Sequence, residues 1–173
     1  AGHNLLTAYI TWDGNCFEGG IVLSESAAAK MACPQVLEPG DKISNRHGSK
    51  GVISQVLPDD EMPKMEDGTP VELICSLGSL LSRMNFGQVR EAVLGRIARA
   101  EGTVAYAPAF AGPTSDELKT RLKAANLPAD GMEQLSLAGE KMAYRSSVGW
   151  VYWGCTIHVA RRKLQVTRGE PPR

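Results

Sequence analysis

The sequence has 173 residues, 43% of them hydrophobic, and carries equal numbers of acidic and basic side chains. This length and composition suffice for one hydrophobic core, so we expect a single domain and exclude a mainly disordered chain. We also expect a soluble protein, because no apolar run approaches the roughly 20 residues of a membrane-spanning helix and the N-terminus lacks a secretion signal.

The first half of the chain predicts strands and one short helix. Apolar residues alternate from Leu6 to Trp12, and this period of two is typical of a strand. An apolar run at residues 21–23 leads into the alanine-rich residues 26–32, which favour a short helix. Residues 51–57 and 71–77 are rich in Val, Ile and Leu and are bounded by Gly, Pro or Asp, so we expect two further strands there.

The second half changes period. Apolar residues recur at helical spacing over residues 85–99, with Asn85 as the expected cap. Residues 103–113 contain prolines and small residues and predict a connector. A capping box at residues 114–117 predicts a second helix that ends at Leu127-Pro128, and the alternation over residues 147–159 predicts a strand with many aromatic side chains.

Residues 40–51 form the most informative segment, Gly-Asp-Lys-Ile-Ser-Asn-Arg-His-Gly-Ser-Lys-Gly. Glycines let a backbone approach an anion closely, and lysine and arginine side chains suit phosphate oxygens. The segment therefore predicts a phosphate-binding loop. Its spacing differs from that of the nucleoside-triphosphatase phosphate loop, because Ser49 precedes Lys50 and Gly51 follows it.

This segment begins an ordered series of further motifs. They are Val52-Ile53-Ser54, Pro58, Glu61-Met62-Pro63, residues 67–71, Ser82-Arg83-Met84-Asn85 and Gly87-Gln88. Trp12-x-Gly14-x-x-Phe17-Glu18 precedes the series, and weaker matches follow it as far as Tyr152. Together these motifs resemble the catalytic barrel of the β subunit of bacterial multisubunit DNA-directed RNA polymerase.

The resemblance implies a mainly β fold, a six-stranded double-psi β-barrel with a small α+β extension. We expect the barrel and its phosphate-binding loop in residues 1–88 and the extension in residues 89–160. Residues 161–173 carry five Lys or Arg and one Glu and are expected to form a basic flexible tail. The short segment at residues 26–39 and the absence of the family's other lobes suggest a stand-alone or trimmed relative.

The resemblance also implies roles for individual residues. Lys42 and Lys50 are expected to reach the phosphates of the RNA end and the incoming nucleotide, and Arg83 to contact the triphosphate. Preplaced cations of this kind stabilise the charge that develops during phosphoryl transfer. A second group of candidates for substrate binding comprises Arg46, His47, Gly48 and Gly51. A structural role is equally open for Arg46 and His47, because such residues next to a turn often support it by bonding backbone carbonyls. The sequence shows no carboxylate that would pair with His47 as an acid or base.

A metal site is not expected within this chain alone. The resemblance implies two Mg²⁺ ions held mainly by aspartates of a larger partner subunit, so Mg²⁺ is expected only with that partner. Glu18 is a weak candidate ligand, because Gly19 replaces the second acid of the family's pair. The cysteines form no Cys-x-x-Cys pair, which argues against zinc and favours a reducing cytoplasm. The histidines lie far apart in sequence, and His158 is interpreted as a core or rim residue.

Four functions remain open at this point. The chain is the cationic half of a nucleotidyltransferase site that needs a partner subunit, or a nucleotide- or RNA-binding module that does not polymerise. The third alternative is a repurposed enzyme that acts on a small phosphorylated metabolite. The fourth is a structural role with self-association through Trp150, Tyr152 and Trp153.

Overall fold

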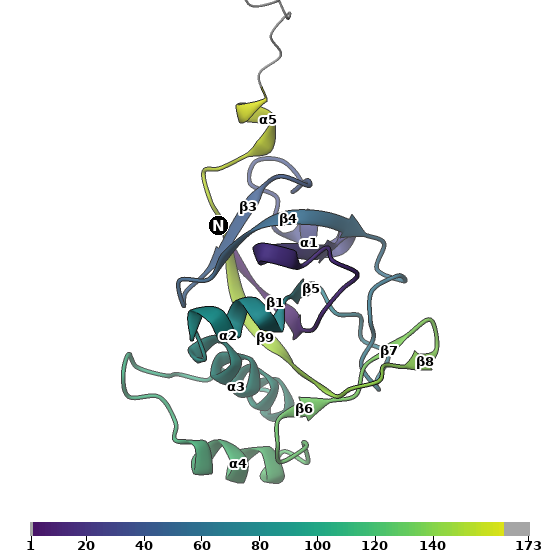
Figure 1. Ribbon diagram of the computed structural model, residues 1–173. Coiled ribbons are helices and arrows are strands. Elements are labelled where there is room, and N and C mark those ends of the chain that lie inside the picture. The colour runs from purple at the N-terminus through teal and green to yellow at the C-terminus, as the bar shows by residue number, and fades with distance from the viewer. Residues whose placement is uncertain (1, 165–173) are drawn as a thin grey trace, which may run out of the picture.

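The computed structural model describes residues 2–164, apart from the side chain of Glu18, and is shown in Figure 1. The strands are β1 (Gly2–Tyr9), β2 (Gly20–Ser24), β3 (Lys42–Asn45), β4 (Lys50–Leu57), β5 (Leu73–Cys75), β6 (Met132–Glu133), β7 (Ser136–Leu137), β8 (Glu140–Lys141) and β9 (Ser146–Cys155). The helices are η1 (Phe17–Gly19), α1 (Glu25–Lys30), α2 (Leu77–Arg83), α3 (Gly87–Glu101), α4 (Ser115–Ala124) and α5 (Ala160–Lys163). None of the helices among these described residues has the length and apolar character needed to cross a membrane.

Six strands close into a barrel, which confirms the expected fold class. Their order is β1, β5, β2, β4, β3 and β9, and β9 pairs back with β1. The pairs β1–β5 and β2–β4 are parallel, whereas the other barrel pairs are antiparallel. A closed barrel leaves no exposed edge along these strands.

The strand that closes the barrel comes from late in the chain. β9 pairs with β1 over seven residue pairs and with β3 over three. The expected division at residue 88 assigns this strand to the extension, but in the structure it contributes to the barrel. Residues 165–173, most of the expected basic tail, lie outside the described part of the chain, and α5 covers residues that include the start of that tail.

The central strands are buried on both faces, so the barrel has two hydrophobic clusters. On β1, Leu5 and Tyr9 belong to the inner cluster around Trp153, and Leu6 and Ala8 belong to a second cluster under the β6–β8 region. Trp153 is 1% exposed and donates its Nε1–H to Thr7 Oγ1 at 3.1 Å. Self-association through Trp153 is therefore wrong, because this side chain is part of the core.

The helix α3 packs directly against β9, as Figure 1 shows. A Cβ atom at Gly149 would lie 2.0 Å from the carbonyl oxygen of Ala92, and one at Gly95 would lie 2.5 Å from that of Trp150. The two backbones can approach this closely only because both positions are glycine. On its other side α3 packs against α4 through Leu94, Ile97, Leu118 and Leu122.

Several predicted element boundaries differ from the structure. The first strand begins at Gly2 and ends at Tyr9, before the expected end at Trp12. The capping box at Thr114 is confirmed. Asn85 does not cap α3, because Phe86 occupies the cap position and Asn85 Nδ2 donates to the carbonyl oxygen of His47 at 3.0 Å.

Candidate functional site

The predicted phosphate loop is a β-hairpin rather than an irregular loop. β3 and β4 pair antiparallel, with Ser44 opposite Lys50 and Lys42 opposite Val52. Side chains alternate between the two faces of a strand. Ile43 and Ile53 are buried, so Lys42 and Lys50 project from the outer face of the hairpin.

Lys42, Lys50 and Arg83 meet at one cleft of about 350 Å³. The remaining residues of its wall are Phe17, Gly19, Gly20, Gly51, Val52 and Ser54. Arg83 reaches the cleft from the last turn of α2. Among the described side chains, no carboxylate lies within 4.0 Å of these three cations. The cleft is thus a concentration of positive charge, which favours anions over cations.

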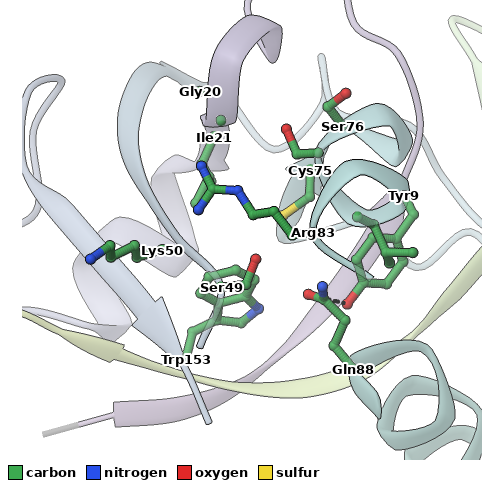
Figure 2. Close-up of a pocket in the computed structure, with 13 residues that line it drawn as sticks. Tyr9, Gly20, Ile21, Ser49, Lys50, Cys75, Ser76, Arg83, Gln88 and Trp153 are labelled. Carbon is green, nitrogen blue, oxygen red and sulfur yellow. Dashed lines mark hydrogen bonds between the residues drawn. The ribbon is translucent and has the colours of Figure 1, made fainter. Parts of the chain in front are cut away.

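Gly19 lies at the centre of this arrangement. Its φ is +90°, and an added Cβ atom would lie 3.9 Å from the carbonyl oxygen of Lys50 and 4.0 Å from the guanidinium of Arg83. Figure 2 shows the Arg83 guanidinium beside Gly20 and Ile21, with the Lys50 ammonium turned away from it. A longer side chain at position 19 would therefore extend toward Arg83. Glycine leaves that guanidinium accessible.

The two candidate glycines of the hairpin have different roles in the fold. Gly48 lies in the turn with a φ of +80° and open space around it, so the left-handed backbone accounts for glycine. Gly51 is buried, and a Cβ atom there would lie 2.2 Å from the carbonyl oxygen of Gly19. Close contact between β4 and Gly19 accounts for this glycine, which also lines the cleft.

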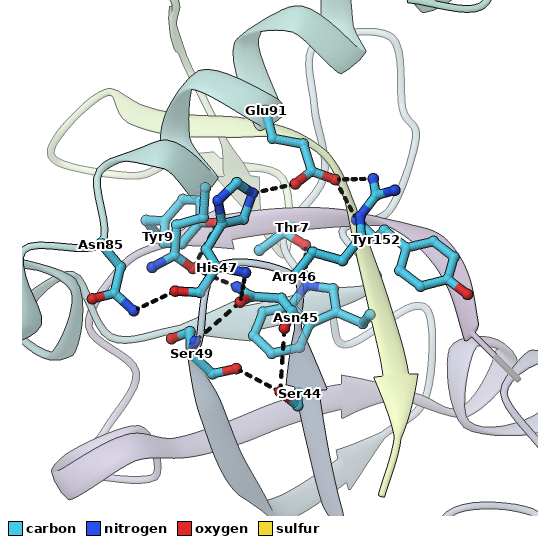
Figure 3. Close-up of polar contacts among 12 residues, drawn as sticks. Thr7, Tyr9, Ser44, Asn45, Arg46, His47, Ser49, Asn85, Glu91 and Tyr152 are labelled. Carbon is cyan, nitrogen blue, oxygen red and sulfur yellow. Dashed lines mark hydrogen bonds and ion pairs between the residues drawn. The ribbon is translucent and has the colours of Figure 1, made fainter. Parts of the chain in front are cut away.

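Arg46 and His47 turn away from the cleft and pair with Glu91 of α3 (Figure 3). Arg46 forms a 2.9 Å ion pair with Glu91 and lies 4.7 Å above the ring of Tyr152. His47 Nε2 contacts the other carboxylate oxygen. The sequence showed no carboxylate for His47, and Glu91 lies 44 residues further along the chain, which explains why it was missed.

The Glu91 carboxylate is held ionised by its neighbours. Burial alone would raise the pKa of Glu91. The backbone N–H of Tyr152, which donates to it at 2.9 Å, together with His47 and Arg46, outweighs burial and holds this pKa below its usual value. All three partners stabilise the charged form. Glu91 therefore ties the hairpin turn to α3 and β9.

His158 also lies beside the hairpin, although sequence reasoning interpreted it as a core or rim residue. Its carbonyl oxygen accepts a hydrogen bond from the Lys42 N–H at 3.1 Å, and its side chain is exposed. Thr156 Oγ1 donates to the Lys42 carbonyl oxygen at 2.8 Å. The end of β9 thus holds the Lys42 backbone. The partners are 114 residues apart, so no local pattern in the sequence signals this contact.

The acidic residues near the barrel do not form a metal site within the described part of the chain. The side chain of Glu18 lies outside the described part of the structure. Asp59 accepts a hydrogen bond from the Ser26 N–H at 3.1 Å and so supports the start of α1. Among described residues, no group of three His, Cys, Asp or Glu side chains is arranged to hold a metal ion.

Comparisons with known proteins agree with the sequence resemblance. Residues 26–171 match the family model described as RNA polymerase Rpb2, domain 6. The chain is 40% identical over 136 residues to the DNA-directed RNA polymerase subunit beta of Syntrophomonas wolfei, covering 78% of this chain and 12% of that protein. It is 35% identical over 161 residues to the same subunit of Aster yellows witches'-broom phytoplasma, covering 92% of this chain and 12% of that protein.

The match covers most of this chain but only a small part of each relative. A third relative, the beta subunit of Solibacter usitatus, is 39% identical over 136 residues, which are 78% of this chain and 10% of the relative. The chain therefore spans about a tenth of the length of these relatives. The family model covers well over half of the chain, and the closed six-stranded barrel agrees with it. This chain belongs to the family of RNA polymerase Rpb2 domain 6 and is similar to a region of the bacterial β subunit.

Proposed function

We propose that this chain binds the phosphates of a nucleoside triphosphate or of RNA, as the cationic part of a nucleotidyltransferase site. The observation that carries the proposal is the cleft at which Lys42, Lys50 and Arg83 meet without a described carboxylate partner. Like charges repel one another, so three cations at one cleft are most stable with an anion bound between them.

The chemistry of the three side chains supports the proposal. The guanidinium of Arg83 offers paired N–H donors to two oxygens of one phosphate, and the lysine ammonium groups act as compact charges. During phosphoryl transfer negative charge is distributed over the phosphate oxygens, and cations already in place stabilise it without reorganisation. Lys42 and Lys50 are held on paired strands, which limits their displacement.

The described residues of the cleft do not fit Mg²⁺ by themselves. Their side chains provide cations, hydrophobic groups and one hydroxyl, whereas Mg²⁺ prefers carboxylate oxygens. We therefore assign to this chain phosphate binding only. Transfer would require a larger polymerase-type subunit to supply aspartates together with Mg²⁺.

Exposed apolar side chains around the cleft support such a partner. Phe17 is 77% exposed and Met84 is 74% exposed, although both are large apolar residues. Exposed apolar residues also include Leu77 and Leu81 of α2, Val52 of β4 and Phe86, just before α3. Large apolar side chains exposed to solvent in one region are typical of a surface that another protein covers. The free cysteines suit a reducing cytoplasm, where the proposed complex would act.

The residues at the cleft also favour a second candidate, phosphate binding without transfer. Gly19 replaces the second acid of the family's pair, and its position faces Arg83. A module that only binds nucleotide or RNA phosphates needs the cations but not that acid. A stand-alone enzyme for a small phosphorylated metabolite would use the same three cations.

Titration calorimetry with ATP tests phosphate binding directly. We expect Lys50→Ala, Lys42→Ala and Arg83→Ala each to weaken binding by about tenfold, because each removes a charged donor. Lys141→Ala is the matched control, since this exposed lysine lies in β8, outside the cleft. Running the titration with EDTA measures binding by the cations alone. No heat for the wild type, or equal losses for Lys141→Ala, would overturn the proposal.

A reconstitution experiment separates the two candidates. The chain is mixed with a polymerase-type subunit that carries the aspartates, and RNA synthesis is measured with Mg²⁺ present. Synthesis that disappears in Lys50→Ala supports the nucleotidyltransferase. A chain that binds ATP and the partner but supports no synthesis would favour the binding module.

A further inference from the structure

The turn between β3 and β4 is organised by one side chain, that of Asn45 (Figure 3). Asn45 Oδ1 accepts hydrogen bonds from the backbone N–H groups of His47 at 2.9 Å and Ser49 at 3.1 Å. The Asn45 N–H in turn donates to the Ser49 carbonyl oxygen at 2.9 Å. Both backbone polar groups of Ser49, the residue directly before Lys50, are thus bound by Asn45.

Asn45 is itself held by Gln88 of α3. Asn45 Nδ2 donates to Gln88 Oε1 at 2.9 Å. The hydroxyl of Tyr9 donates to the same oxygen at 3.3 Å, and Figure 2 shows Tyr9 beside Gln88. Asn45 is 8% exposed, Gln88 2% and Tyr9 3%. Burial raises the pKa of the Tyr9 hydroxyl, so it remains a donor at neutral pH.

One short segment, residues 85–91, makes the polar contacts that join α3 to Asn45 and the turn. Asn85, just before α3, donates to the carbonyl oxygen of His47, and Glu91 pairs with the His47 ring. Asn85, Gln88 and Glu91 are spaced by three residues, which places them on one side of the helix. Asn45 and the turn are therefore bound at three successive points, at Asn85 just before α3 and at Gln88 and Glu91 within it.

We propose that Asn45 and Gln88 are positioning residues that hold Lys50 in place for phosphate binding. The proposal rests on the function proposed above. Neither side chain lines the cleft of Lys42, although Gln88 lines the adjoining pocket of Figure 2 together with Lys50. Asn45 therefore acts through the backbone of Ser49, and Gln88 acts through Asn45. Buried hydrogen bonds are suited to this because a displaced partner leaves an unsatisfied polar group, which makes alternative positions of the turn costly.

The network predicts a graded set of effects. Asn45→Ala removes the two bonds to the turn and the bond to Gln88, so it should have the largest effect. Gln88→Met retains the bonds between Asn45 and the turn but removes their anchor, so its effect should be smaller. Tyr9→Phe removes only the outermost bond and should have the smallest effect.

Two measurements test this order, ATP affinity by calorimetry and amide hydrogen exchange of His47 and Ser49 by NMR. We expect about tenfold weaker binding and about tenfold faster exchange for Asn45→Ala, because the side-chain hydrogen bonds of Asn45 are lost. Asn45→Asp retains an acceptor for both N–H groups and should restore the slow exchange. Gln134→Met is the control, because Gln134 makes two hydrogen bonds far from the hairpin, to Leu135 and Met142.

The outcomes are separable from those of the proposed function. If the wild type binds no ATP, the proposed function fails, while the exchange rates still decide whether Asn45 and Gln88 order the turn. If Gln134→Met and Gln88→Met lower thermal stability equally and weaken ATP binding equally, positioning is overturned. Unchanged exchange at Ser49 in Asn45→Ala would also overturn it. Tyr9→Phe, the mildest variant, provides the comparison if Asn45→Ala does not fold.

Discussion

The two parts of the hairpin use positive charge in different ways. At the strand ends, Lys42 and Lys50 face a cleft and have no described carboxylate within 4.0 Å. In the turn, Arg46 and His47 are paired with Glu91. Four side chains that look alike in a motif are thus divided by hairpin geometry into two that can receive a ligand and two that hold the turn against α3.

The largest loss of stability is expected in the strand part of the hairpin, where β4 contacts Gly19. Gly51→Ala would push a Cβ atom into the Gly19 carbonyl oxygen, which lies 2.2 Å from its ideal position. We expect the free energy of unfolding, measured by urea denaturation, to fall by about 3 kcal/mol. Gly48, in the turn, has open space around it but a positive φ. Gly48→Ala should therefore lower the free energy of unfolding by about 1–2 kcal/mol.

Gly78→Ala serves as the control for this pair. Gly78 lies within α2, and its nearest contact is Ser76 Oγ at 3.4 Å. Alanine favours a helix over glycine, so no loss of stability is expected. Equal losses in Gly51→Ala and Gly48→Ala would contradict the distinction between close backbone contact and backbone conformation.

The next largest loss of stability is expected for Glu91→Gln, and this loss depends on pH. The pKa of Glu91 in the folded state is lower than in the unfolded state, so the unfolded chain binds the proton first as pH falls. The stabilisation is complete above the usual glutamate pKa and is lost as pH falls through that value toward the folded-state pKa. Glu91→Gln should lose about 1–2 kcal/mol at neutral pH.

Urea denaturation at several pH values measures this contribution. Between about pH 6 and about pH 3, the stability of Glu91→Gln should decline less steeply than that of the wild type, because one group with a lowered pKa is gone. Identical slopes would show that Glu91 is not the titrating group that links the turn to α3.

The smallest effect is expected for Arg46→Ala. The Arg46 side chain is 64% exposed, and exposed ion pairs and cation–π contacts contribute little. We expect a loss of less than about 1 kcal/mol in stability and an ATP affinity within about twofold of the wild type. A loss of affinity as large as that of Lys50→Ala would show that the turn cations also bind phosphate.

Local patterns predicted those parts of the fold that depend on neighbouring residues. The capping box at Thr114 and the alternation in β9 both lie within short segments, and both elements are present. β3 was not predicted, because its residues lie within the phosphate motif and include only one apolar residue, Ile43. α2 was missed because its seven residues include Gly78 and because its first residue, Leu77, was assigned to the strand expected at residues 71–77.

Contacts between distant residues could not be predicted in the same way. The family motif located Lys42, Lys50 and Arg83, and the structure brings them to one cleft. Glu91 and Gln88 lie more than 40 residues from their partners in the turn. Gln88 belongs to the family motif, but the motif does not identify Asn45 as its partner, and nothing in the segment distinguishes Glu91 from an ordinary polar residue of a helix surface. The barrel likewise needed β9, which pairs with a strand at the other end of the chain.

The two glycines between α3 and β9 set a limit on sequence variation far from the cleft. At Gly95 and Gly149 even one methyl group would overlap a backbone carbonyl of the opposite element. Any larger residue there must lift α3 away from the sheet, and with it Gln88 and Glu91. These positions make no contact with the cleft. Substitutions at them should nevertheless reduce ligand affinity in parallel with those at Asn45, as a remote class of loss-of-function variants.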